Sequence, residues 1–97
     1  MRTKVELEAW SSYYEYDDGT RDAMAGLFSW PTELDLPFLQ RGVDLQLNGR
    51  ACGVAKATVM EDGSQVVRCR LSIGYNRFRE PRFADLREWG WTLTKEF

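Results

Sequence analysis

Apolar and polar residues alternate at the start of the chain. Val5, Leu7 and Ala9 are separated from one another by charged residues. Successive side chains of a β-strand point to opposite faces of a sheet, so a period of two indicates a strand with one buried face. The pattern predicts a strand over residues 3–9 whose apolar side chains point inward.

Residues 10–19, WSSYYEYDDG, combine four aromatic rings with three carboxylates. The run Asp17-Asp18-Gly19 favours a turn, so we expect the first strand to continue into a hairpin with its tyrosines packed across it. Tyrosine is also enriched at protein interfaces, which makes this hairpin a candidate contact surface. The two adjacent aspartates lack the alternating oxygens and the distal glutamate of a calcium loop. The candidate interface residues are Tyr13, Tyr14, Tyr16 and, from the C-terminal segment, Trp91.

Residues 43–72 read as a three-stranded meander. VDLQLNG alternates and ends in Asn48-Gly49, a strong signal for a two-residue hairpin turn. A second turn, Glu61-Asp62-Gly63, is predicted as a three-residue loop with Gly63 in a left-handed conformation. The first turn places even-numbered residues of the middle strand, such as Cys52 and Val54, on the core side, whereas the second turn places odd-numbered ones, such as Ala55 and Ala57, there. A bulge at Gly53 would reconcile the two registers.

The register of the second turn assigns residues to the two faces of the meander. Met60 faces Ser64 in this register, which keeps the arginines off the apolar face. The predicted apolar face holds Ala55, Ala57, Val59, Val67, Cys69 and Leu71, and the predicted outer face holds Lys56, Thr58, Met60, Val66, Arg68 and Arg70.

The C-terminal region predicts a helix followed by a strand. Pro81 and Gly90 have the residue types that begin and follow a helix, and the apolar residues between them recur every third position, which predicts a helix over residues 81–89. Residues 91–96 alternate as a closing strand. Residues 20–42 are ambiguous: the first part fits a short helix or the return arm of a hairpin, and TELDL between two prolines fits an edge strand or an extended loop.

These elements predict an α+β fold in a single domain, residues 1–97. We expect a curved antiparallel β-sheet of five or six strands with one short helix near the C-terminus. A partly open barrel is one form of this fold, and a closed barrel with residues 91–96 paired against the first strand is the alternative.

Composition supports a globular domain. Hydrophobic residues make up 43% and charged residues 29% of the chain, and no apolar run approaches the length of a membrane span. The N-terminus has no continuous apolar signal core, and two cysteines do not form a disulfide framework, so the expected location is cytoplasmic. The net charge of −2 is uneven: residues 1–48 contain four basic and nine acidic residues, residues 49–97 nine and six.

The sequence offers little catalytic chemistry. It contains no histidine, the commonest general base and a frequent metal ligand, and it has no glycine-rich phosphate loop or nucleophile elbow. We therefore expect no cofactor, no metal site and no catalytic residue, although a carboxylate-only hydrolase stays open as an alternative.

Residues 75–83, YNRFREPRF, interleave arginines with aromatic rings, a mixture that can grip phosphates and stack bases. The alternative is that the aromatic residues anchor a loop while the arginines pair with acidic side chains. A sequence pI near 5.1 favours this alternative and makes nucleic acid an unlikely partner. The candidate polyanion residues are Lys56, Arg68, Arg70, Arg77, Arg79 and Arg82.

Abundant aromatic residues without catalytic chemistry favour a non-catalytic binding module that acts through protein–protein contacts. We expect it to self-associate as a homodimer through the C-terminal segment, because the closing strand carries charges only at its end. Two other functions stay open: polyanion binding through residues 75–83, and small-molecule binding in an aromatic-lined pocket of Trp30, Phe38, Trp89 and Trp91.

Overall fold

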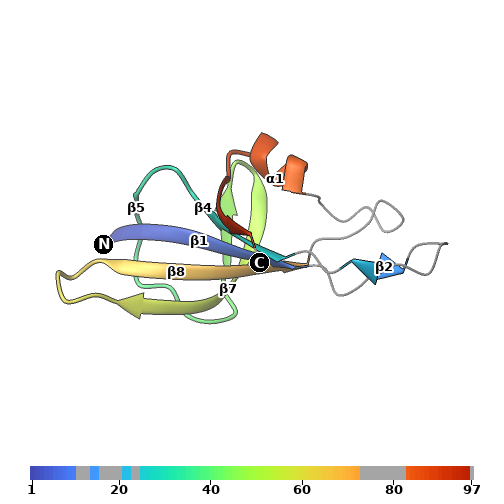
Figure 1. Cartoon of the computed structure of the whole chain (residues 1–97). Helices are drawn as coiled ribbons and strands as arrows, with labels where there is room; N and C mark the ends of the chain where they lie inside the picture. Colours follow the sequence, from blue (N-terminus) through green and yellow to red (C-terminus); the bar gives the residue numbers. More distant parts are fainter. Residues whose placement is uncertain (11–13, 16–20, 23–24, 73–82, 97) are drawn as a thin grey trace.

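The computed structural model describes residues 1–10, 14–15, 21–22, 25–72 and 83–96. Figure 1 shows a curved sheet that does not close into a barrel, with one short helix in the part of the chain described, which confirms the predicted α+β fold. The elements are β1 (Arg2–Trp10), β2 (Tyr14–Glu15), β3 (Arg21–Asp22), β4 (Ala25–Ser29), β5 (Leu34–Asp35), β6 (Asp44–Leu47), β7 (Arg50–Val59), β8 (Gln65–Ser72), α1 (Phe83–Glu88) and β9 (Thr92–Glu96).

The first strand lies at the centre of the sheet. The strand order is β6-β7-β8-β1-β4-β9, and β5 pairs with the beginning of β1. β1 is antiparallel to β4 but parallel to β8, so the sheet contains one parallel pairing that the prediction of an antiparallel sheet lacked. Pairing between strands that are about sixty residues apart is decided by the path of the whole chain, and local alternation carries no signal for it.

The meander between residues 43 and 72 has the predicted turns. Asn48 and Gly49 both have positive φ, as a two-residue hairpin turn requires, and Gly63 has a φ of 82°. Val59 pairs with Gln65, in the predicted register. The bulge, however, lies at Ala55 and not at Gly53, since the register shifts between Val54 and Lys56. Ala55 therefore leaves the predicted apolar face.

The bulge bends β7 so that its first half and β6 fold over the core toward α1. The tip of the β6–β7 hairpin contacts the end of the helix, where the Asn48 side chain donates a hydrogen bond of 3.0 Å to the Trp89 carbonyl. The guanidinium carbon of Arg50 lies 3.6 Å from the centre of the Trp89 ring. Gly90 permits this approach, since it has a φ of 110° and a Cβ there would lie 3.4 Å from the Asn48 side chain and 3.1 Å from the Trp30 ring.

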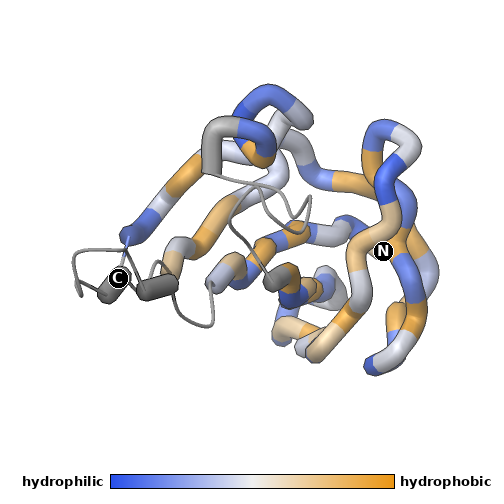
Figure 2. The backbone as a smooth tube through the Cα atoms, turned by 90° about the vertical axis from the view of Figure 1, so that its right-hand side faces the viewer, coloured by the Kyte–Doolittle hydropathy of each residue, from blue (hydrophilic) through white to orange (hydrophobic). Residues whose placement is uncertain are grey.

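The core lies on the concave face of the sheet. Val5, Leu7 and Ala9 are fully buried, as predicted, and they pack with Phe28 and Leu86. Figure 2 shows the alternation of hydrophilic and hydrophobic positions along the strands that produces this one-sided burial.

A buried amide ties the loop before β6 to the core. Gln65 is fully buried and donates hydrogen bonds to Thr3 Oγ1 (2.9 Å) and to the Pro37 carbonyl (2.7 Å), while its oxygen accepts one from Leu39 N (3.2 Å). All three contacts join segments that are distant in the sequence. A buried amide with satisfied partners stabilises such a junction.

The ambiguous regions are now assigned. β3 pairs antiparallel with β2, which confirms the hairpin interpretation over the helix, and TELDL contains the short strand β5. α1 spans Phe83–Glu88, within the predicted range of 81–89; residues 81 and 82 lie outside the described residues. β9 pairs with β4 and not with β1, so the closed-barrel alternative is wrong.

Candidate functional site

The convex face of the sheet carries a cluster of charged side chains on β1 and β8. On β1 and β8 the inward and outward side chains alternate, and the outward positions pair Glu6 with Arg68 and Glu8 with Arg70. These side chains remain half-buried or exposed, because α1 and the Trp30–Leu39 segment pack on the opposite face. We refer to this convex side as the outer face.

A groove of about 620 Å³ lies on the outer face. It brings together three of the predicted polyanion residues and adds a fourth cation, Arg41. Arg41 reaches the groove because Gly42, with a φ of 90°, turns the chain beside β7 and donates a hydrogen bond of 2.8 Å to the Val54 carbonyl. We call this the basic groove; it is lined by Glu8, Arg41, Ala55, Lys56, Thr58, Val66, Arg68 and Arg70.

Two carboxylates of β1 hold the arginines of the basic groove. Arg68 Nη2 lies 3.1 Å from Glu6 Oε2, and Arg68 Nη1 lies 3.7 Å from Glu8 Oε2. Arg70 Nε also lies 3.7 Å from Glu8 Oε2. Within the described residues, Arg41 and Lys56 form no ion pair. The groove thus holds two anchored cations and two that can pair with an incoming anion.

The remaining predicted polyanion residues, Arg77, Arg79 and Arg82, lie outside the described residues, as do Tyr13 and Tyr16. Tyr14 lies in β2, paired with Asp22. Sequence reasoning missed Arg41. The dipeptide Arg41-Gly42 just before a strand was the available signal, but only the long-range bond to β7 places Arg41 beside Lys56.

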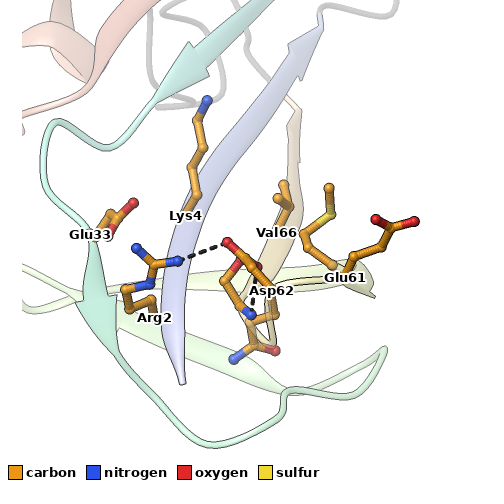
Figure 3. Close-up of a pocket in the computed structure, with 9 residues that line it drawn as sticks. Arg2, Lys4, Glu33, Glu61, Asp62 and Val66 are labelled. Carbon is orange, nitrogen blue, oxygen red and sulfur yellow. Dashed lines mark hydrogen bonds and ion pairs between the residues drawn. The ribbon is translucent and has the colours of Figure 1, made fainter.

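A second hollow, of about 530 Å³, lies where β1 begins and β7 turns into β8. Figure 3 shows Arg2 directed toward Asp62, with a bond of 2.8 Å, while Glu61 extends away from them. Hydrogen bonds from the Ser64 hydroxyl and backbone N–H hold the pKa of the Asp62 carboxyl below its ordinary value, and Arg2 adds to this effect. Two cations, Arg2 and Lys4, stand against the three carboxylates of Glu33, Glu61 and Asp62, so this hollow does not favour an anion.

Three of the four predicted pocket residues come together near the helix. Trp30 and Trp91 meet edge to face with ring centres 5.1 Å apart, and Trp89 and Trp91 line a pocket of about 300 Å³ with Cys52 and Leu86 among its other walls. Burial raises the pKa of the Cys52 thiol, and Asp44 raises it further. Phe38 does not join them: its side chain is 50% exposed, beside the Gln65 junction.

Trp91 is 5% exposed and packs within the chain. Its side chain is therefore not available for packing across a two-fold axis, in contrast to the expectation that Trp91 is an interface residue.

In the part of the chain that the structure describes, no three carboxylate or thiol groups gather in a way that could hold a metal ion. No helix among these residues is both long and apolar enough to cross a bilayer. Comparison with known proteins found no matching family model, no matching curated protein and no matching solved structure.

Proposed function

We propose that the protein is a non-catalytic binding module that acts through protein–protein contacts and self-associates through an open edge of its sheet. The observation that carries the proposal is the position of β9. It pairs with β4 on one side, and no other described strand pairs with it. An unpaired strand edge presents a row of N–H and C=O groups that a second chain can pair with.

The composition of β9 supports pairing about a two-fold axis. Its sequence, TLTKE, carries charges only in its last two residues. Residues 92–94, up to the irregularity in the register of β9 against β4, carry no charge, so two copies can approach there about a two-fold axis without opposing like charges. Threonine also favours the pleated surface of a strand.

Sedimentation equilibrium from micromolar concentration upward tests this proposal. We expect the apparent mass to increase with concentration toward twice the 11.3 kDa of one chain. Trp30 N–H donates to the Val5 carbonyl on the β1 side. By alternation, the backbone groups of Ser29 and of Thr92 opposite it face each other, and those of Leu93 point outward. Leu93→Pro removes this outward donor and should weaken the dimer. Leu93→Ala keeps the donor and is the matched control. A chain that stays monomeric at every concentration would overturn self-association.

The pocket lined by Trp89 and Trp91 supports a second candidate function, the binding of a small molecule. Its volume lies at the lower end of the range for ligand sites, and Arg50 stands at its wall over the Trp89 ring. Native mass spectrometry of protein taken directly from a lysate should then show a bound small mass. That mass should disappear in Trp89→Ala, and a protein that carries no added mass contradicts this candidate.

A further inference from the structure

The half of β7 that follows the bulge is a second open edge. β6 pairs with β7 only as far as Gly53, and the chain before β6 then exchanges two hydrogen bonds with Val54, at Val43 and Gly42. From Lys56 to Val59, β7 pairs with β8 alone among the described strands. In Figure 1 the arrowhead end of β7 lies along the border of the sheet.

The direction of the backbone groups follows from the turn. Met60 N–H donates to the Ser64 carbonyl on the β8 side. Backbone groups alternate in direction along an antiparallel strand, so those of Ala57 and Val59 point away from β8. No other described residue bonds these groups, and two such residues can support the central bonds of one added strand.

The side chains along this edge differ between the two faces. On the outer face, Lys56 and Arg41 line the basic groove without ion pairs among the described residues. On the concave face, Val59 is 54% exposed and pairs with Gln65. The backbones of Pro37 and Leu39 bond the Gln65 side chain, so the exposed Phe38 between them lies near this edge. A strand added here would meet cations with its outward side chains and apolar surface with its inward ones.

We propose that the β7 edge binds an extended acidic segment of a partner protein as an additional strand, with its carboxylates facing Arg41 and Lys56. The ion pairs of Arg68 and Arg70 with β1 hold the floor of the groove in place for this contact. A nucleic acid would use the same cations, and its phosphates could accept from the N–H groups of the edge, but they would leave the carbonyl groups of the edge without donors. The inference rests on the proposed protein-binding function and names the chemistry of the partner.

The probe is a labelled synthetic peptide of alternating glutamate and valine, bound to the full chain and measured by fluorescence anisotropy. Strand addition predicts binding that weakens with added salt and is lost when alternate peptide amides are N-methylated, which keeps the charge but removes the backbone donors. A lysine–valine peptide should not bind. Equal binding of the methylated peptide, or no binding of the acidic one, overturns the inference.

Charge reversal in the groove supplies the second arm. Lys56→Glu should weaken binding of the acidic peptide by about tenfold or more. Lys4→Glu, an equal charge change at an exposed outer-face position that does not line the groove, is the matched control and should have a much smaller effect. If a short oligothymidylate binds more tightly than the peptide and with the same dependence on Lys56, the site is a nucleic-acid site and the inference fails.

Sedimentation of the same variants separates this inference from self-association. β9 lies at the other border of the sheet, so Lys56→Glu should leave the dimer intact. A dimer without peptide binding defeats only the β7 site. Peptide binding by a monomer defeats only self-association.

Discussion

The two faces of the β1–β8 pair share the same strands and the same backbone, yet they have different roles. On the concave face, Val5, Leu7, Val67 and Cys69 are fully buried. On the outer face, the residues between them form a ladder of ion pairs that remain in contact with water, with the Arg68 side chain 37% exposed. Alternation along each strand sorts the side chains between the faces, and only the concave face is covered by α1 and residues 30–39.

This difference teaches where the stability of the fold lies. Burial of a large apolar side chain contributes roughly 1.5–3 kcal/mol, whereas an exposed ion pair contributes about 0–1 kcal/mol. The concave face should therefore tolerate few substitutions. The outer face can change its charges at little cost, which leaves it available for binding.

The largest effect is expected from Phe28→Ala. Phe28 is fully buried in the core, so truncation should lower the free energy of unfolding by about 3–5 kcal/mol. Its neighbour Leu27 points to the other face and is half-buried, so Leu27→Ala should cost distinctly less. Urea denaturation of the two variants measures the difference, and equal losses would break the comparison of the faces.

Gln65→Leu tests the contribution of the buried Gln65 amide, a polar side chain within the apolar concave face. The substitution leaves the Leu39 N–H and the Pro37 carbonyl without their partners, at a cost of roughly 1–3 kcal/mol for each group that stays buried. Gln46→Leu is the control, because Gln46 is exposed on β6. Unchanged stability in Gln65→Leu would show that the loop finds other partners.

Gly63→Val tests the turn that assigns residues to the two faces. Gly63 has a φ of 82°, which a β-branched residue adopts at a cost on the order of 1–2 kcal/mol. Gly53 has no positive φ, and a Cβ there would meet only Asp44 at 3.8 Å, so Gly53→Ala should cost little. Thermal unfolding that is unchanged by Gly63→Val would mean that another turn sets the register.

The pH dependence of stability at alkaline pH tests the burial of the concave face without a substitution. Burial raises the pKa of the Cys69 thiol to about 12, and the neighbouring Cys52 contributes, against an ordinary value of 9.0. The folded state therefore holds the thiol proton more tightly than the unfolded state does. The contribution of the protonated Cys69 thiol to the free energy of unfolding is complete below pH 9.0 and is lost as the pH rises toward 12. Just above pH 9.0 the loss is small. Cys69→Ala should flatten the decline in unfolding free energy, and an identical slope would contradict the role of Cys69.

The smallest effect is expected from Glu6→Gln on the outer face. It removes one carboxylate from Arg68, which keeps Glu8 at 3.7 Å, so the loss of stability should stay below about 1 kcal/mol. Chemical denaturation at low and high salt measures it. A loss as large as that of Phe28→Ala would show that the ion ladder, and not the core alone, supports the fold.

Local patterns predicted the turns and the meander. Asn48-Gly49 and the glycine at position 63 act over two to four residues, and their chemistry is complete in the sequence. The bulge was expected at Gly53 but lies at Ala55, because the chain before β6 pairs with Val54 and shifts the register there. Of the candidate site residues, Lys56, Arg68 and Arg70 were expected on one face and line one groove, whereas Phe38 does not join the tryptophans.

The sequence by itself determined which side chains of β1 and β8 face the core, because the two-residue period of a strand is a local property. It also determined the hairpin turns and the short C-terminal helix. Only the tertiary structure decided that β1 is central and parallel to β8, that β9 forms one border, and that Arg41 joins the basic groove. These features depend on contacts between segments that are remote along the chain, and such contacts form only when the whole core is assembled.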